Sequence, residues 1–414
     1  MEGCRPEHHC SGGDPIQNSG NYQSISSDPE RNRIAWFKLK LIPGLGNTSI
    51  LRLLEVFGSP EKVLAARADE LCQTGLPLNK ALRALASKQF AIDPEPEWKK
   101  FRESGFRLIC VGDDEYPANL AKIPDRPAVL FSSGLPAPRD LISIAVVGSR
   151  LASPAGILFT QKLASDLALS GITVVSGLAL GIDSAAHRGA LKAGGRTLAV
   201  LGCGLGVNYP AANADLRQEI TRSGVLLTEF PPGTPPASGN FPSRNRIISG
   251  LTLGVVVVEA AERSGSLITA RFALEQGREV FAVPGVAGST RSQGAHRLLK
   301  QGAKLVECVE DILEEIRPLI RPTPSSESSL ATSPGEKGEF FSPPFSKGGQ
   351  GGFENPASPE ETLLLRVLDK VPKHIDEIAR EARISVQHAS SILLELELRG
   401  LVSQLPGKYF ICSQ

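Results

Sequence analysis

The chain of 414 residues carries 45 Lys and Arg against 44 Asp and Glu, a formal net charge of +1, and 41% of it is hydrophobic. This balance excludes an overall polycation, so any affinity for nucleic acid must come from a local basic patch. The sequence contains no run of about 18 apolar residues, so we expect no membrane-spanning helix. The polar start lacks the apolar core of a signal peptide. The seven cysteines form no CxxC pair, so neither a disulfide framework nor a zinc ribbon is indicated. We expect a cytoplasmic protein with no metal and no cofactor.

The first part of the chain divides into a leader and a helical module. Residues 1–30 are rich in Ser, Gly, Asn and Asp and predict a disordered leader. Apolar repeats broken by glycine predict helices within residues 31–107. The segment 43–46, Pro-Gly-Leu-Gly, allows a tight turn, and Asn47 or Thr48 is expected to cap the helix that follows. Such a turn is typical of a helix–hairpin–helix (SAM-like) module, which offers N–H groups to a phosphate. An ordinary helical turn is the other interpretation.

Residues 108–318 alternate short apolar runs with amphipathic helices, which predicts βαβ units. Near-continuous apolar strands indicate a parallel sheet with helices on both faces. The fold class is therefore α/β, with an extended Rossmann-like sheet of about seven strands. The predicted strands are Ile142–Val147, Thr173–Ser176, Thr197–Leu201, Val225–Glu229, Gly254–Glu259, Glu279–Val283 and Lys304–Glu307. The predicted helices lie near residues 155–169, 183–193, 213–222, 243–251, 266–276, 293–301 and 309–316.

Two segments follow the predicted sheet domain. Residues 319–359 are rich in Pro, Ser and Gly and predict a linker, because this composition cannot build a core. Residues 360–414 predict three helices and a short hairpin, the order of a winged helix-turn-helix. Its third helix, residues 386–399, would enter the major groove in a DNA reader. That helix carries two glutamates and no lysine or arginine before Arg399. A contact with another protein is therefore at least as consistent with this sequence as DNA binding.

Small, hydroxyl and arginine residues gather at the carboxyl ends of the predicted strands. Ligands of open parallel sheets bind beyond these ends, often on helix N-termini. Residues 141–306 hold 16 Lys and Arg and 9 Asp and Glu, and several phosphate sites on one edge suit an oligonucleotide better than a mononucleotide. Small residues such as Gly177 let a phosphate approach the backbone. The hydroxyl donors are Ser149, Ser264, Ser266 and Thr269, and the fork donors matched to phosphate are Arg150, Arg244 and Arg246.

Enzymatic interpretations find less support in the sequence. The sequence contains no GxxxxGK[ST] run, so it does not indicate a P-loop ATPase. In the segment 202–206 the third glycine comes one residue too early for the dinucleotide-binding fingerprint, so support for NAD binding is weak. Asp183 and His187 lie four residues apart, but we expect Asp183 to cap its helix and His187 to pack beside the ligand groove. Glu229 and Glu259 end strands with no nucleophile or metal cluster beside them. We interpret both as partners of nearby arginines.

Six stretches of the sheet domain occur together in one known family. They are AVVGSR (145–150), VVSGLALGIDSAAHRGAL (174–191), TLAVLGCGLGVNYPAAN (197–213), LLTEFPPGTPP (226–236), FPSRNRIISGL (241–251) and VVVVEAAERSGSLITARFALEQGREVFAVPG (255–285). With them the chain closely resembles the DNA-processing protein A family of bacteria (DprA, also called Smf). The helical module and the winged-helix tail match the family's accessory domains less specifically.

The resemblance implies a DNA-binding protein and not an enzyme. Members of that family hold single-stranded DNA in a basic pocket, protect incoming strands during natural transformation, load the recombinase RecA and dimerise through the sheet domain. The motif match implies DNA contacts at Gly148, Ser149, Arg150, Arg244, Asn245, Arg246, Ser264, Gly265 and Ser266. Some relatives carry a lysine after the Tyr-Pro step, where Ala211 and Ala212 stand here, so one cationic contact is missing or comes from Arg217. We expect the dimer surface at Ala303–Leu319.

Two alternatives remain open. Phosphoribohydrolases of the lysine-decarboxylase-like (LOG) group share the sheet plan and cleave a nucleotide's glycosidic bond, but residues 262–269 read ERSGSLIT instead of their PGGxGT-type loop. A regulator acting through the winged helix would instead bind duplex DNA with residues 360–414. For a single-strand binder, we expect replacement of Arg150 or Arg246 by alanine to weaken binding by about 1–3 kcal/mol.

Overall fold

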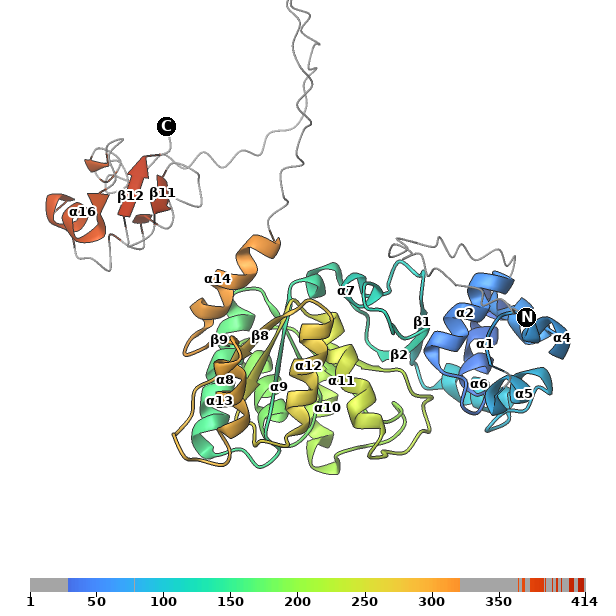
Figure 1. Ribbon diagram of the computed structural model, residues 1–414. Helices are drawn as coiled ribbons and strands as arrows, with labels where there is room; N and C mark the ends of the chain where they lie inside the picture. The colour runs from blue at the N-terminus through green and yellow to red at the C-terminus, as the bar shows by residue number, and fades with distance from the viewer. Residues whose placement is uncertain are drawn as a thin grey trace, which may run out of the picture. The chain divides into compact units, whose positions relative to one another are not determined.

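The computed structural model describes two compact units of the chain, residues 1–326 and 327–414, which are treated separately below (Figure 1). In the first unit the described residues are 29–320 without residue 78. In the second they are residues 364, 367, 368, 373–382, 384, 389, 392, 393, 396, 402–405 and 409–412. Almost all of the predicted leader and linker therefore lies outside the described residues.

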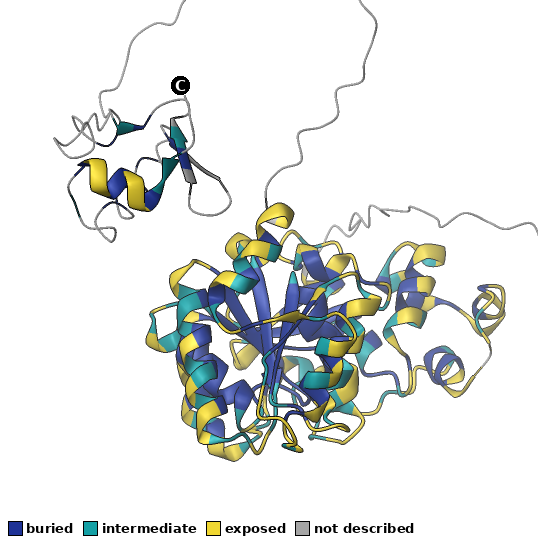
Figure 2. Ribbon diagram, turned by 60° about the vertical axis from the view of Figure 1, so that its left-hand side comes forward, coloured by how far each residue is buried: buried dark blue, intermediate teal, exposed yellow. Residues whose placement is uncertain are grey.

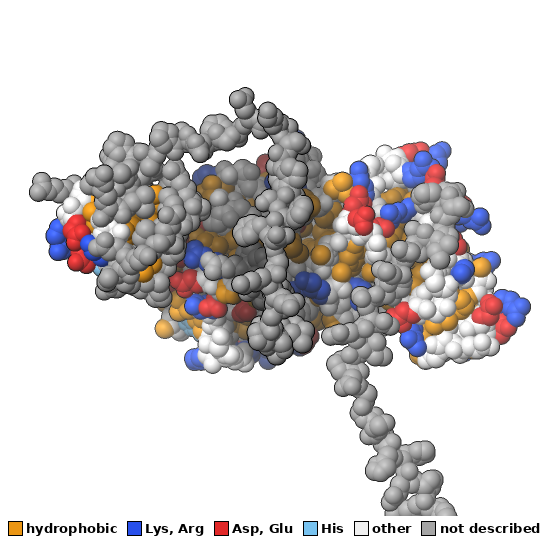
Figure 3. Space-filling model, turned by 90° about the horizontal axis from the view of Figure 1, so that it is seen from above, with side chains coloured by type: hydrophobic (Ala, Val, Ile, Leu, Met, Phe, Trp, Pro, Cys, Tyr) orange, Lys and Arg blue, Asp and Glu red, His pale blue; other side chains and the backbone are white. Residues whose placement is uncertain are grey.

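The first unit begins with a helical module. Its helices are α1 (Pro29–Lys40), α2 (Asn47–Phe57), α3 (Pro60–Ala65), α4 (Ala68–Cys72), α5 (Lys80–Ala86) and α6 (Pro94–Glu103). Side-chain caps begin several of them, as Asn79 accepts from two N–H groups of α5 and Asp93 from one of α6. Phe37 joins α1 to α6, with its ring 5.3 Å from that of Trp98 and 5.5 Å from that of Phe101. Acidic and basic side chains are interspersed on the face seen in Figure 3.

A nine-stranded sheet follows, in the order β1-β2-β6-β5-β4-β3-β7-β8-β9. The strands are β1 (Arg107–Cys110), β2 (Val129–Ser133), β3 (Ser143–Gly148), β4 (Thr173–Ser176), β5 (Thr197–Val200), β6 (Val225–Thr228), β7 (Gly254–Val258), β8 (Glu279–Ala282) and β9 (Lys304–Leu305). Strands β3 to β9 pair in parallel and occupy the seven predicted segments. The antiparallel strands β1 and β2, at one side of the sheet, were not predicted, because such short runs outside a βαβ alternation carry no periodic signal.

Helices cover both faces of this sheet, which confirms the predicted α/β class. One apolar cluster packs α8, α9 and α14 on one face, and another packs α11, α12 and α13 on the other. In Figure 2 the strands are buried while the outward sides of the helices are exposed. The helices are α7 (Ala118–Ala121), α8 (Pro154–Leu169), α9 (Ile182–Lys192), α10 (Ala214–Ser223), α11 (Asn240–Leu251), α12 (Gly265–Glu275), α13 (Gln293–Lys300) and α14 (Val309–Ile320), with 3-10 turns at Pro138–Leu141 and Ala211–Asn213.

Polar contacts hold helix α2 of the module against the sheet. The amide nitrogen of Asn47 donates to Glu229 (2.5 Å), and its amide oxygen accepts from the N–H of Ala128 (3.2 Å). The N-cap of α2 is Gly46, with no side-chain cap, so the predicted cap by Asn47 or Thr48 is wrong. Because the Asn47 side chain is committed to the sheet, the start of α2 meets a carboxylate of the same chain. The predicted phosphate site on this turn is therefore not supported.

The second unit contains a small sheet and a helix. Its strands β10 (Lys373–His374), β12 (Tyr409–Cys412) and β11 (Val402–Leu405) form an antiparallel sheet in that order, and α16 spans Ile375–Ala382. One helix of the predicted winged helix and its short hairpin are confirmed. Within the predicted third helix, Ala389, Ile392, Leu393 and Leu396 are buried. The polar positions of that helix, which decide between DNA and protein contact, lie outside the described residues. None of the helices in the described ranges combines the length and apolarity that crossing a bilayer requires.

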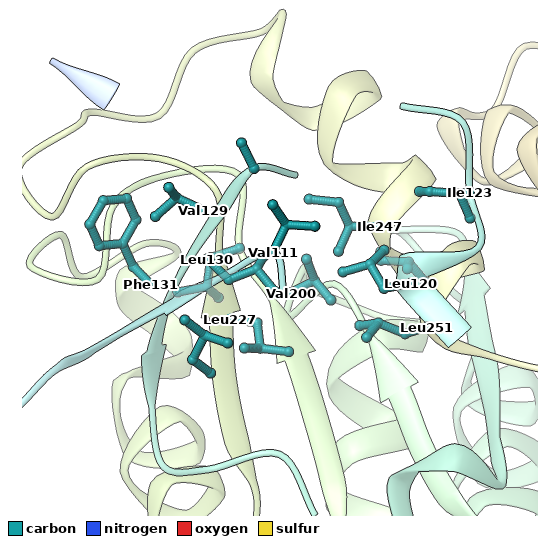
Figure 4. Close-up of a cluster of buried hydrophobic side chains, with 14 of the residues drawn as sticks. Val111, Leu120, Ile123, Val129, Leu130, Phe131, Val200, Leu227, Ile247 and Leu251 are labelled. Carbon is teal, nitrogen blue, oxygen red and sulfur yellow. The ribbon is translucent and has the colours of Figure 1, made fainter. Parts of the chain in front are cut away.

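A buried apolar cluster joins the edge strands to helix α11 (Figure 4). Leu120 of α7 and Ile247 of α11 are fully buried, and Leu251 is nearly so. Helix α7 approaches α11 closely at Gly250, where a Cβ atom would come within 2.9 Å of the Leu120 side chain. This close packing sets the position of α11 relative to the strand ends.

Truncation of Leu120 tests this packing. We expect Leu120→Ala to lower the free energy of unfolding by about 2–5 kcal/mol, because it leaves a cavity against α11. Urea denaturation followed by far-UV circular dichroism measures the change. The matched control is Leu169→Ala at the end of α8, a position 72% exposed, where a change within about 0.5 kcal/mol is expected. Equal losses in the two variants would contradict the packing role.

Candidate nucleic-acid interface

A cavity of about 630 Å³ opens at the carboxyl edge of the sheet, where β3 and β7 are neighbours. From β3 the chain continues to β4 on one side, and from β7 it continues to β8 on the other. This reversal of strand order is the position at which open α/β sheets bind ligands. Nine predicted site residues line the cavity, namely Gly148, Ser149, Arg150, Arg244, Asn245, Ser264, Gly265, Ser266 and Thr269.

The backbone approaches the cavity closely at two places. A Cβ atom at Gly148 would lie 1.9 Å from the carbonyl oxygen of Val258, so only glycine fits between β3 and β7. Ser264 is the N-cap of α12, with its hydroxyl accepting from the N–H of Ser266 and lying 2.8 Å from the Ser266 hydroxyl. The first turn of α12 borders the cavity and brings to it the partial positive charge of a helix N-terminus. The α12 N-terminus favours an anion, whereas glycine at position 148 serves the close packing of β3 against β7.

Exposed cationic and aromatic side chains lie together at the rim. The guanidinium of Arg150 lies 5.3 Å from the centroid of the Phe241 ring, and that ring lies 5.8 Å from the ring of Tyr209, which is 38% exposed. Arg263, also exposed, lines the cavity beside Ser264. Such a rim offers charge to phosphates and ring faces to bases. Sequence reasoning missed Arg263, although its place directly before the Ser264 loop was a usable signal, and it missed the aromatic pair.

Arg244 forms part of the cavity floor and is 4% exposed. Its guanidinium donates to the carbonyl oxygens of Gly177 (2.7 Å) and Val200. The carboxylate of Asp183 accepts from the N–H groups of Gly177 (3.2 Å) and Ala179 (3.3 Å), just before α9, whose N-cap is Gly181. Burial lowers the pKa of Arg244 to about 10, although the charge of Asp183 opposes this shift. Burial also raises the pKa of Asp183, and Arg244 opposes that shift.

Gly177 borders a second, smaller hollow of about 120 Å³, which it shares with Arg150 and Arg244. It does not line the main cavity. A Cβ atom at this glycine would lie 2.6 Å from the Arg244 guanidinium. Its small size therefore serves the seating of Arg244, and not the close approach of a phosphate in the main cavity.

Arg246 points away from the cavity, in contrast to the sequence prediction. It is 7% exposed, and its guanidinium forms ion pairs with Glu229 (2.8 Å) and Asp125 (2.9 Å). Residues two apart on a helix differ by about 200° around its axis, so Arg244 and Arg246 must face opposite sides of α11. The three predicted arginines cannot line one groove, and the expected single-strand contact of Arg246 has no geometric support. Glu229 is confirmed as an arginine partner.

Two other expectations are corrected by the structure. Glu259 has no arginine partner within the described residues. Its carboxylate accepts from the N–H (2.8 Å) and the hydroxyl of Ser153 at the start of α8. Arg217 donates to the carbonyl oxygens of Leu205 and Val207 (3.0 Å). It therefore closes the loop after β5 and does not replace a cationic contact in the cavity.

His187 lies in the core, and not beside the cavity. Its Nδ1 is 2.7 Å from the hydroxyl of Thr197, which itself donates to the carbonyl oxygen of Val174 (2.7 Å). The hydroxyl has only one proton, so Nδ1 must be protonated, and the buried Nε2 has no partner. Burial lowers the pKa of His187 to about 3. This neutral, enclosed ring is no acid–base partner for Asp183. Among the described residues no group of three His, Cys, Asp or Glu side chains could hold a metal ion.

The fold and the cavity define a doubly wound α/β protein with a cavity at the carboxyl edge of its sheet. The family model "DNA recombination-mediator protein A" matches residues 107–317, and "DprA winged helix domain" matches residues 354–408. Protein Smf of Escherichia coli is 38% identical over 90% of this chain and 94% of its own length. DNA processing protein DprA of Streptococcus pneumoniae is 41% identical over 67% of this chain and 96% of its own.

The X-ray structure of the Streptococcus pneumoniae protein is similar to this chain with a TM-score of 0.61 and 40% identity. The similarity covers 68% of this chain and 97% of that one. The chain therefore belongs to the DNA recombination-mediator protein A family, the family of DprA and Smf, which confirms the resemblance found in the sequence.

Removal of Arg246 tests its structural role. We expect Arg246→Ala to lower the free energy of unfolding by about 3–5 kcal/mol, because Glu229 is left buried without its cationic partner. Urea denaturation measures the loss. Arg271→Ala is the control, since its ion pair with Glu275 is exposed (3.6 Å) and a change below about 0.5 kcal/mol is expected. If Arg246→Ala lowered the free energy of unfolding as little as Arg271→Ala, the ion pairs of Arg246 would not stabilise the fold.

His187 predicts a dependence of stability on pH. In the unfolded chain its ring titrates at a pKa of about 6.5, whereas in the folded protein its pKa is lowered to about 3. The unfolded state thus binds the extra proton first, and the free energy of unfolding falls as the pH drops below about 6.5. We expect His187→Gln to make the free energy of unfolding fall less steeply between about pH 6.5 and 5, by up to about 1.4 kcal/mol per pH unit. Urea denaturation at a series of pH values measures this slope. An equally steep fall in the variant would refute this.

Proposed function

We propose that this protein binds single-stranded DNA at the cavity between β3 and β7, protects incoming strands during natural transformation and loads the recombinase RecA onto them. The observation that carries the proposal is the joint placement of the α12 N-terminus and exposed Arg150 around one cavity of about 630 Å³. These groups suit phosphates, and the neighbouring rings of Phe241 and Tyr209 suit unpaired bases. Membership in the DprA family supports the same function.

In this proposal the site residues divide by what they contact. Arg150 and Arg263 pair with phosphates at the rim. Phosphates approach the backbone at Gly148 and Gly265, and the hydroxyls of Ser149, Ser264, Ser266 and Thr269 donate to them. Arg244, Asn245 and Gly177 hold the floor, as Asn245 donates to the carbonyl oxygen of Gly265 (3.2 Å). Since most donors meet phosphates, binding should be insensitive to base sequence and sensitive to salt.

The proposal treats the protein as a binder and not an enzyme. Asp183 is the only carboxylate among the residues that line the cavity, and it is committed to two backbone N–H groups beside Arg244. With Asp183 committed in this way, the cavity offers no carboxylate that is free to act as a general base in cleaving a glycosidic bond. We place the binder in the cytoplasm, as a homodimer that meets RecA. The family description, a recombination mediator, supports the contact with a recombinase.

Loss of Arg150 tests the binding site. We expect Arg150→Ala to weaken the binding of oligo-dT by about 1–3 kcal/mol, the range of charge-assisted contacts. Fluorescence anisotropy at low salt measures the affinity. Arg188→Ala is the matched control, because this exposed arginine of α9 does not line the cavity and its loss should leave affinity unchanged. Binding equal to the parent's would refute the site. Release of free base from a nucleoside monophosphate would favour the phosphoribohydrolase alternative.

A further inference from the structure

A further hollow, of about 450 Å³, lies between α12 and α13. It shares Arg263, Ser264 and Ile268 with the cavity, so the two hollows adjoin at the start of α12. From this junction the further hollow extends along α12 as far as Leu274. We call it the α12–α13 groove. Nothing in the proposed cavity site uses its far end.

Positive charge dominates the groove. Arg263, Arg271 and Arg297 line it together with a single carboxylate, Glu262. All three arginines are exposed. Arg271 forms one long, exposed ion pair with Glu275 (3.6 Å), which contributes little, and the other two arginines have no ion-pair partner within the described ranges. An anionic occupant would therefore meet cations that are free to bind it.

The lining residues of α12 share one helix face. Ser264, Leu267, Arg271 and Leu274 follow one another at spacings of three or four, which places them in a row along the helix. At 1.5 Å per residue, the helical stretch from residue 265 to residue 274 spans about 14 Å. Leu274 is 61% exposed. Arginine and leucine side chains thus alternate along the groove, which offers charge to phosphates and apolar surface to bases.

We propose that the α12–α13 groove binds the DNA strand where it leaves the cavity, with Arg271 and Arg297 contacting phosphates beyond Arg263. This inference rests on the proposed single-strand binding at the cavity. An acidic protein segment would meet the same charges, but the continuity of the groove with the cavity through Arg263 favours the strand. The groove then extends the binding site beyond the nucleotides held at β3 and β7.

Oligonucleotide length separates the groove from the cavity. We expect the double variant Arg271→Ala/Arg297→Ala to bind oligo-dT of about 20 nucleotides about tenfold more weakly, while oligo-dT of about 4 nucleotides, near the lower limit of known site sizes, binds unchanged. Loss of two phosphate contacts should also lower the slope of log affinity against log salt by about 1.4 for the long strand. Fluorescence anisotropy over a salt series measures both effects.

The matched control is Arg188→Ala/Arg222→Ala, which removes two exposed arginines of α9 and α10 and should change neither affinity. Urea denaturation confirms that each variant folds. If the groove variant binds the long strand like the parent, or loses affinity equally for both lengths, the groove proposal is overturned. Arg150→Ala separates the two proposals, because it should weaken both lengths. Its failure to do so would overturn the cavity site itself, and the groove's role as an extension with it.

Discussion

Helix α11 is held by buried cations on two opposite sides, and the geometry of the site depends on this constraint. On one side Arg246 pairs with Glu229, which also accepts from Asn47 of the helical module. On the other side Arg244 donates to carbonyl oxygens at the ends of β4 and β5. A buried guanidinium without partners is costly, so neither arginine can leave its place cheaply. The wall of the cavity is thereby tied to the module and to the sheet at once.

Because two of the three predicted arginines serve the fold, the charge open to a ligand comes from few groups. The positive charge of Arg244 lies beside Asp183, which offsets it at the floor. Arg150 and Arg263 remain at the rim, and the α12 N-terminus adds partial charge between them. Exposed charges of this kind are screened by salt, and none reads a base edge. The structure thus favours a site that follows a phosphate backbone and accepts any sequence.

The parallel strands could be predicted because all but the exposed edge strand β9 are short apolar runs between a helix and a turn, as Val255–Val258 shows. The edge strands could not, since β1 and β2 lack that alternation. Most of the site followed from the rule that ligands bind at strand ends. The predicted contact of Arg246 with the ligand was wrong because the rule ignores rotation around a helix, which places Arg246 and Arg244 on opposite sides of α11. The pairing of Phe241 with Tyr209 was hidden because their contact depends on how two distant loops meet.

The helix N-termini of α2 and α12 show why a local motif does not decide function. Both follow glycine- or serine-containing turns that suit an anion. At α2 the side-chain amide of Asn47 donates to the Glu229 carboxylate, and this bond joins the module to the sheet. At α12 the first turn borders a cavity whose exposed charged side chains, among the described residues, are arginines. One helix start therefore anchors the fold and the other borders an open cavity, and only the packing around each helix distinguishes them.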